Sequence, residues 1–303
     1  MVLVVGVDAG GTASRAVVAT PDGKIVGRGS AGPGNPASAG AAAARSIGTA
    51  VRAALGGHDP GSVIAGAGGV AGASVLSDPA IVAAFDAEWA GLGLTCPVEL
   101  TGDAVTAFAA GVPAPRGAVL IAGTGAVAAR VENWRVGRTA DGLGWLLGDE
   151  GSGLWLGLEA VRRVARSWTS TPDGLAAAVA AHAGVRSCDE LVHWAGRQHP
   201  AAFAALAPLV CASDDPLAAR LTAEAGARLV ATLGELGAPD GPVVLAGGLL
   251  TEPTPVREAV LTALPGPVAT AHDPAAGAAW LALRRALDLD AGTAADLHHR
   301  MLP

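Results

Sequence analysis

Two segments of the 303-residue chain pair glycines with a threonine at a turn between two apolar runs. The first turn is Asp8-Ala9-Gly10-Gly11-Thr12, and the second is Ala122-Gly123-Thr124-Gly125-Ala126. Glycines let backbone N–H groups approach an anion closely, and a threonine adds a hydroxyl donor. The two turns therefore predict a polyphosphate site. Its expected contacts are Gly10, Gly11, Thr12, Ser14, Gly123, Thr124 and Gly125.

The only lysine of the chain, Lys24, excludes two familiar phosphate-binding designs. It follows a turn at Asp22-Gly23 and precedes isoleucine. It is therefore neither the lysine of a Walker A loop nor the strand lysine of a protein kinase. The donors to phosphate must then be backbone amides, hydroxyls, arginines and a metal ion. Asp8 could simply stabilise its own turn. We predict instead that it holds Mg²⁺ through water, because Mg²⁺ keeps part of its hydration shell.

Asp103 lies in Thr101-Gly102-Asp103-Ala104, where a predicted strand meets a predicted helix. An aspartate at this place can cap the helix. A hydroxyl that accepts a phosphoryl group also needs a carboxylate to orient it and take its proton. Asp103 meets that need without losing the capping role, so we predict that it is the catalytic base.

Three further segments allow both a structural and a functional interpretation. Gly148-Asp149-Glu150-Gly151-Ser152 is either a helix-capping loop or a binding site for the hydroxyls of a polyol. Asn35, within Gly-Pro-Gly-Asn-Pro, is either a turn residue or a ligand of sugar hydroxyls. Gly247-Gly248 follows an apolar strand, and we predict close backbone contact with an adenine or a ribose.

Composition limits the class of protein. A chain of 303 residues that is 51% hydrophobic can form one large domain or two of ordinary size. A net charge of −7 argues against a nucleic-acid surface. Three cysteines without CxxC spacing predict reduced thiols in a cytoplasmic protein. No apolar run reaches the roughly 18 residues of a membrane span, so no membrane is expected as a partner.

The apolar pattern predicts an α/β fold. An antiparallel meander is expected over 2–7, 14–20 and 24–29, followed by a helix over 38–55 and further strands and helices. The strand-turn-strand pattern restarts after Pro113-Ala114-Pro115, which suggests a duplicated fold. In the second half, helices are expected over 152–168, 173–183, 188–197 and 200–235. A strand at 242–246 and a helix at about 275–288 follow, and the tail is predicted to be weakly ordered.

The motifs together resemble the actin/hexokinase/Hsp70 superfamily of ATP-dependent phosphotransferases. The two Gly-Thr turns look like its two phosphate motifs, and Leu245-Ala246-Gly247-Gly248-Leu249 looks like its adenosine motif. More narrowly, the chain is similar to the N-acetylglucosamine kinase branch of the BadF/BadG/BcrA/BcrD ATPase family. The segments that carry this similarity are Gly32-Pro33-Gly34-Asn35-Pro36, Thr101-Gly102-Asp103-Ala104, Gly148-Asp149-Glu150-Gly151-Ser152 and Asp273-Pro274-Ala275-Ala276-Gly277-Ala278.

The resemblance implies two ribonuclease-H-like (actin-like ATPase) domains with ATP and Mg²⁺ in a central cleft. The domains would be 1–113 and 114–279, with a helical insertion at about 152–235 in the second. A C-terminal helix at about 280–303 would pack back on the first. Asp103 would be the base for the sugar 6-hydroxyl, and a homodimer is a family expectation. The implied substrate-binding residues are Asn35, Asp103, Gly125, Asp149 and Glu150.

The sequence thus predicts an ATP-dependent sugar kinase that phosphorylates the 6-hydroxyl of N-acetylglucosamine. The nearest alternative is glucosamine, or another amino sugar, and Glu150 or Asp141 could then meet the amine. A dehydratase-activating ATPase is more distant, because the three cysteines lack the spacing that the family uses to hold an iron–sulfur cluster. A non-catalytic sugar sensor is disfavoured by the presence of both Asp8 and Asp103.

Overall fold

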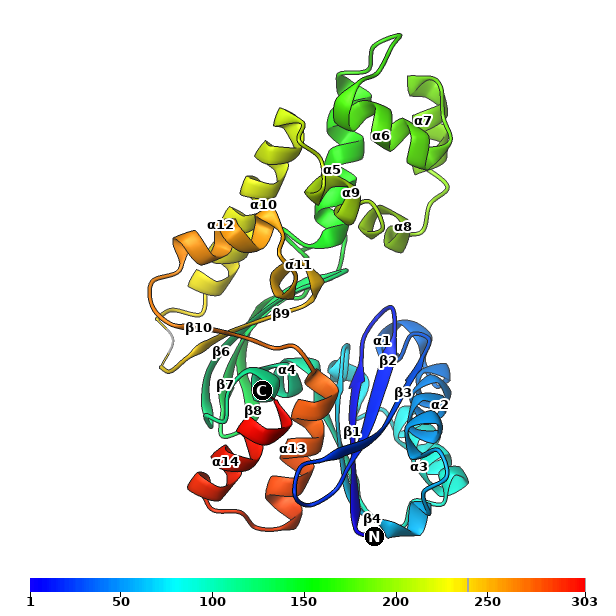
Figure 1. Ribbon diagram of the computed structural model, residues 1–303. Coiled ribbons are helices and arrows are strands. Elements are labelled where there is room, and N and C mark those ends of the chain that lie inside the picture. Colours follow the sequence, from blue (N-terminus) through cyan, green and yellow to red (C-terminus); the bar gives the residue numbers. More distant parts are fainter. Residues whose placement is uncertain (239, 303) are drawn as a thin grey trace. The chain divides into compact units, whose positions relative to one another are not determined.

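The computed structural model describes residues 1–238 and 240–302 and divides into two compact units (Figure 1). Unit 1 comprises Met1–Val119, Val131–Gly137 and Ala269–Pro303, and unit 2 comprises Leu120–Arg130 and Arg138–Val268. The expected domains, 1–113 and 114–279, stay a prediction, since compact packing units need not coincide with domains.

The two sheets share one strand order. The first sheet runs β3-β2-β1-β4-β5, and the second runs β10-β9-β6-β7-β8. In each, the earliest strand is central, the next two lie on one side and the last two on the other. This repetition confirms the predicted α/β fold with a duplicated topology. The strands are β1 Leu3–Ala9, β2 Ser14–Ala19, β3 Ile25–Ala31, β4 Val63–Val70, β5 Val98–Gly102, β6 Arg116–Ala122, β7 Ala126–Glu132, β8 Arg135–Asp141, β9 Val243–Ala246 and β10 Val268–Thr270.

Helices cover both faces of the first sheet (Figure 1). Residues of β1 alternate between the faces, as expected for a strand buried on both sides. Leu3, Val5 and Val7 pack with α2 and α3, whereas Val4 packs with α4, α13 and α14. The helical elements of unit 1 are α1 Pro36–Ala39, α2 Ala42–Leu55, η1 Pro60–Ser62, η2 Ala73–Val75, α3 Pro79–Leu92, α4 Asp103–Gly111, α13 Pro274–Ala286 and α14 Ala291–Met301.

Glycines allow α13 to lie directly on β1 and α4. A Cβ added to Gly6 in β1 would lie 2.1 Å from the carbonyl oxygen of Ala275. A Cβ added to Gly277 in α13 would lie 2.6 Å from the carbonyl oxygen of Thr106 in α4. Because these neighbours are backbone atoms that cannot move aside, only glycine permits this packing.

Unit 2 is rich in helices, which pack mainly on one another. The helices α5 and α10 are long and amphipathic, and the others are short. The helices of unit 2 are α5 Gly153–Arg166, α6 Gly174–Ala183, α7 Cys188–Ala195, α8 Pro200–Ala204, α9 Ala207–Cys211, α10 Pro216–Gly234, α11 Gly248–Thr251 and α12 Pro255–Ala263.

The structure corrects several expected elements. The single helix expected over 200–235 is three helices, α8, α9 and α10, because prolines at 208 and 216 can stand only in the first turn of a helix. The tail expected to be weakly ordered contains α14, whose Leu297 and Met301 are buried. The sequence analysis did not anticipate β8, β10, α11 or α12.

Among the described residues, no single helix has the length and apolar character needed to cross a membrane. The segment Pro200–Cys211 and α10 meet that test only as a pair bent by 115°.

We predict that Gly6→Ala destabilises the protein by about 3 kcal/mol, because overpacking forces α13 away from β1. Urea unfolding would measure the change in the free energy of unfolding. Gly57→Ala is the matched control, since no described atom lies within 4 Å of its added Cβ. A Gly6→Ala protein as stable as the control would contradict the described contact between α13 and β1.

Candidate functional site

The parallel strands of the first sheet bring two acidic residues to one edge. β4 pairs in parallel with both β1 and β5. Asp8 lies opposite Gly69 of β4, and Gly102, directly before Asp103, lies opposite Val70. The carboxyl ends of these strands therefore meet at one edge. Asp8 lies on β1, and Asp103 directly follows β5, two strands away in the sheet, which is about 10 Å by the usual strand spacing.

The Asp8 carboxylate is largely buried, with 18% of its side chain exposed. Burial, followed by the charge of Asp103, raises the pKa of Asp8 to about 7. Arg15, whose Nη1 lies 3.9 Å from Oδ2 of Asp8, lowers that pKa, and Asp273 raises it slightly. Arg15 is 66% exposed, so solvent screens much of its effect. This edge of the sheet therefore carries negative charge that the nearby arginine only partly offsets.

Asp103 is the first residue of α4, directly after β5. Burial raises the pKa of its carboxyl, and a hydrogen bond from the backbone N–H of Ala104 opposes that rise. A carboxylate with a raised pKa is a stronger base towards a hydroxyl proton. The position thus suits proton transfer as well as the start of a helix.

The loop that carries Asn35 is bonded to the first Gly-Thr turn. The Gly34 N–H donates to the Gly10 carbonyl at 3.0 Å, and the Ser14 hydroxyl donates to the Gly32 carbonyl at 3.0 Å. Ser14 is fully buried, so its side chain connects the two loops, and its predicted contact with ATP stays a prediction.

Asn35 itself caps the short helix α1. Its Oδ1 accepts a hydrogen bond from the Ala37 N–H at 2.8 Å. A Cβ on Gly72 would lie 2.2 Å from that same oxygen, so Gly72 leaves room for the cap. The side-chain amino group of Asn35 is then the part that can donate to a ligand.

The second Gly-Thr turn rests on the beginning of α5. Backbone N–H groups of Gly153 and Leu154 donate to the carbonyls of Gly123 and Thr124, at 2.8 and 3.1 Å. The Gly123 N–H donates to the Gly125 carbonyl at 2.9 Å, which closes the turn. The first amides of α5 are thereby used to fix the turn.

The Gly247-Gly248 motif lies beside that second turn. Gly247 has a φ of +81° and directly precedes α11 as its N-cap. A Cβ added to it would lie 2.4 Å from the Ala122 carbonyl oxygen and against β6. Only a glycine with this backbone conformation allows the end of β9 to approach the end of β6 so closely.

An acidic loop between β8 and α5 is organised by Asp141. Its carboxylate accepts hydrogen bonds from the N–H groups of Asp149 and Glu150, both at 2.7 Å. Asp149 has a φ of +57°, which is uncommon for a residue with a side chain. The Asp149 carboxylate accepts from the Ala126 N–H at 3.0 Å, next to Gly125. Burial and then the charge of Asp141 raise the pKa of Asp149, against that hydrogen bond.

The structure thus groups the predicted residues within each unit. In unit 1, the sheet edge relates Asp8 to Asp103, and hydrogen bonds join the Gly10 turn to the Asn35 loop. In unit 2, Gly125 adjoins Asp149, while the Glu150 carboxylate binds Arg228. Gly11, Thr12, Thr124 and Gly248 are exposed. Trp145, which the sequence could not place, is 51% exposed.

Sequence reasoning missed Arg15 and Arg228 and gave Asp273 no role. Asp273 caps α13 through Ala276 and accepts from Arg28 at 2.7 Å. Arg15 lies opposite Asp8 on the adjacent strand β2, whereas the bond between Arg28 and Asp273 joins segments 245 positions apart and leaves no signal in the spacing. Only the folded structure shows that Arg228 meets Glu150, 78 positions away.

The residues around Asp8 are compatible with Mg²⁺. Among the described residues, no three His, Cys, Asp or Glu side chains are grouped closely enough to hold a metal by themselves. Mg²⁺ bound with substrate phosphates needs only one or two carboxylates and otherwise keeps water. A carboxylate whose pKa is raised by burial and by the charge of Asp103 fits that role, since a cation would favour its charged form.

A family model matches residues 5–282 of this chain, which covers both Gly-Thr turns, Asp103, the acidic loop and Gly247-Gly248. The chain belongs to the BadF/BadG/BcrA/BcrD ATPase family. The curated proteins hold no sequence match. This is a family of ATPases, which supports ATP binding by this chain.

Solved structures agree with that family. A candidate N-acetylglucosamine kinase from Chromobacterium violaceum is 25% identical, with a TM-score of 0.73 over 93% of this chain and 99% of that one. A second candidate N-acetylglucosamine kinase, from Porphyromonas gingivalis, is 23% identical, with a TM-score of 0.76 over 95% of this chain and 100% of that one. A ROK family glucokinase from Streptomyces griseus, solved with glucose and AMPPNP, is 24% identical, with a TM-score of 0.58 over 92% and 99%. Together with the family, these likenesses support an ATP-dependent sugar kinase.

We predict that Asp8→Asn stabilises the ligand-free protein at pH 8. Folding raises the pKa of Asp8 from 3.8 to about 7, so the native state loses stability as the pH rises between these two values, and the loss is complete above the upper one. Removing the charge should add at most about 4 kcal/mol at pH 8 and much less at pH 5. Thermal unfolding at the two pH values would measure the shift.

Asp290→Asn serves as the control for that experiment. A hydrogen bond from the Thr293 hydroxyl lowers the pKa of Asp290 at the beginning of α14, so folding favours the charged form of this carboxyl. Asp290→Asn should therefore not raise the midpoint of thermal unfolding. A lower midpoint for Asp8→Asn at both pH values would contradict a buried, poorly compensated carboxylate at Asp8.

Proposed function

We propose that the protein transfers the γ-phosphoryl group of ATP to the 6-hydroxyl of N-acetylglucosamine. The observation that carries this proposal is the placement of Asp103, a partly buried carboxyl with a raised pKa at the sheet edge that also holds Asp8. The first Gly-Thr turn begins at that same edge. An acceptor base and a phosphate turn therefore belong to one local framework.

Each group has a defined task in this proposal. Asp103 accepts a hydrogen bond from the 6-hydroxyl, orients it and takes its proton as the bond to phosphorus forms. Backbone amides and threonines of the two turns bind the phosphates, and Gly247-Gly248 contacts the nucleoside. Asp8 would hold Mg²⁺, which when bound neutralises phosphate charge. The amino group of Asn35 and the carboxylate of Asp149 bind sugar hydroxyls.

The acidic loop favours the acetylated sugar over glucosamine. A glucosamine site is expected to offer a carboxylate to the ammonium group, and the sequence suggested Glu150 or Asp141. Glu150 is paired with Arg228, and Asp141 accepts two backbone N–H groups. Both carboxylates are therefore already engaged by other donors, which makes each of them less available to an ammonium group. Their engagement supports N-acetylglucosamine as the substrate.

The dehydratase-activating alternative finds less support. Cluster ligands are thiolates, and burial raises the pKa of Cys96 and raises that of Cys211 to about 11. The dehydratase component A from Acidaminococcus fermentans is only 15% identical to this chain. Its TM-score of 0.51 therefore indicates a shared fold alone. A homodimer stays a family expectation.

Asp103→Asn should lower kcat by about 10²- to 10⁴-fold, since general base catalysis contributes that much. Steady-state kinetics with ATP and N-acetylglucosamine would measure it. Asp78→Asn is a matched control, because Asp78 also stands at the start of a helix, where it caps α3. Asparagine caps about as well as aspartate, so that variant should keep wild-type activity. An Asp103→Asn enzyme within a few-fold of wild type would rule out the assigned base.

A substrate panel tests the choice of sugar separately. We expect kcat/KM for N-acetylglucosamine to exceed that for glucosamine at least about tenfold, the discrimination typical of one mismatched polar group. Coupled ATP-consumption assays would compare N-acetylglucosamine, glucosamine, N-acetylmannosamine and glucose. A preference for glucosamine would overturn the argument from Glu150 and Asp141 while leaving sugar kinase activity intact.

A further inference from the structure

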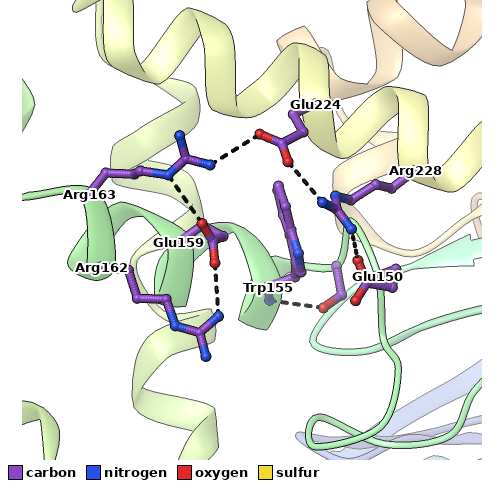
Figure 2. A network of polar contacts seen from close by, with 8 residues as sticks. Glu150, Trp155, Glu159, Arg162, Arg163, Glu224 and Arg228 are labelled. Atoms are coloured by element: carbon purple, nitrogen blue, oxygen red, sulfur yellow. Dashed lines mark hydrogen bonds and ion pairs between the residues drawn. The ribbon is translucent and has the colours of Figure 1, made fainter.

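Arg228 lies at the centre of a polar network that joins α10 to the acidic loop (Figure 2). One guanidinium nitrogen, Nη1, binds the Glu150 carboxylate, and Nη2 binds Glu224 at 2.9 Å. The guanidinium carbon lies 4.8 Å from the centre of the Trp155 ring in α5. Three separate contacts thus fix one side chain between a loop and two helices.

The position of Arg228 carries an energetic cost, which indicates that its contacts matter. Its Nε is buried and has no hydrogen-bond partner among the described residues. An unsatisfied buried donor is unfavourable, so the two carboxylates and the Trp155 ring must outweigh that loss. The paired carboxylates also raise the pKa of Arg228, and the guanidinium keeps its charge.

Glu150 directly follows Asp149, whose backbone is in the left-handed region. Asp141 holds the two N–H groups of this pair from one side. Arg228 holds the Glu150 side chain from another, and Gly151 packs against α10, where an added Cβ would lie 2.5 Å from the Ala225 carbonyl oxygen. The strained backbone at Asp149 is therefore restrained on both sides.

We propose that Arg228, through Glu150, is a positioning residue that fixes the Asp149 carboxylate for binding the sugar. This inference rests on the proposed function, in which Asp149 contacts sugar hydroxyls. Arg228 itself does not contact the substrate. Its planar, two-pronged guanidinium suits the task because it can bind both carboxylates while lying on the indole ring.

The same network contains a matched control. Arg163 binds Glu224 at 3.5 Å and Glu159 at 3.3 Å, on the side of the network away from Glu150 (Figure 2). Arg163→Met therefore removes an arginine that links α5 and α10 but leaves the acidic loop untouched. Arg228→Met removes one that also holds the loop.

Two measurements on the full-length protein test the inference. Hydrogen exchange should show faster exchange of the Asp149 and Glu150 amides in Arg228→Met than in wild type or Arg163→Met. Steady-state kinetics should show about a tenfold rise in the KM for N-acetylglucosamine, corresponding to one weakened charged hydrogen bond. The kcat and the KM for ATP should stay within about threefold of wild type, because phosphate contacts are unchanged.

Two further variants test the route through Glu150. Glu150→Gln should reproduce the rise in the sugar KM, and the double variant should be no worse than the poorer single variant, since both remove one shared interaction. Arg228→Lys should raise the sugar KM less than Arg228→Met does, because lysine keeps the charge but not the two-pronged geometry.

Defined outcomes would overturn the inference. Unchanged amide exchange in Arg228→Met, an unchanged sugar KM, or an equal rise in Arg163→Met would each show that Arg228 does not position Asp149. Failure of the proposed function looks different, because the wild-type protein would then phosphorylate no amino sugar. Amide exchange would still decide whether Arg228 restrains the loop.

Discussion

The parallel pairing of β4 with β1 and β5 is the constraint on which the candidate site of unit 1 depends. The carboxyl ends of parallel strands meet at the same edge of a sheet. Asp8 and Asp103, which are 95 positions apart, therefore come to one edge without any direct bond between them. Helices on both faces keep this edge partly shielded from water, which is why both carboxyls have raised pKa values. The sheet thus determines both where Asp8 and Asp103 lie and in which direction their pKa values shift.

Backbone hydrogen bonds from neighbouring segments fix the shape of both Gly-Thr turns. The first turn is bonded to the Asn35 loop, and the second is bonded to the beginning of α5. In both cases an amide of a neighbouring segment holds a turn carbonyl, so the turn needs no cationic side chain to keep its shape. Rigidity of this kind suits a site that must present several N–H groups at once.

The sequence predicted the elements whose signals are local. The alternation of β1, the glycines at the turns and Asp103 at a strand-to-helix junction are all visible within a few residues. The residue pattern by itself predicted a weakly ordered tail, and only the family resemblance implied a C-terminal helix there, because the stability of α14 comes from packing Leu297 and Met301 in the core of unit 1. It also could not show that Glu150 would meet Arg228, since an ion pair between distant segments leaves no periodic pattern.

The bond between Gly34 and Gly10 has a consequence for how such enzymes diversify. It ties the Asn35 loop to the first Gly-Thr turn, so an insertion in the loop would disturb the geometry of the turn, and the reverse. The acidic loop around Asp149 is held instead by the side chains of Asp141 and Arg228, which single substitutions can replace. Under the proposed function, new sugar preferences should therefore arise more readily by evolution within residues 141–150 than within residues 32–36.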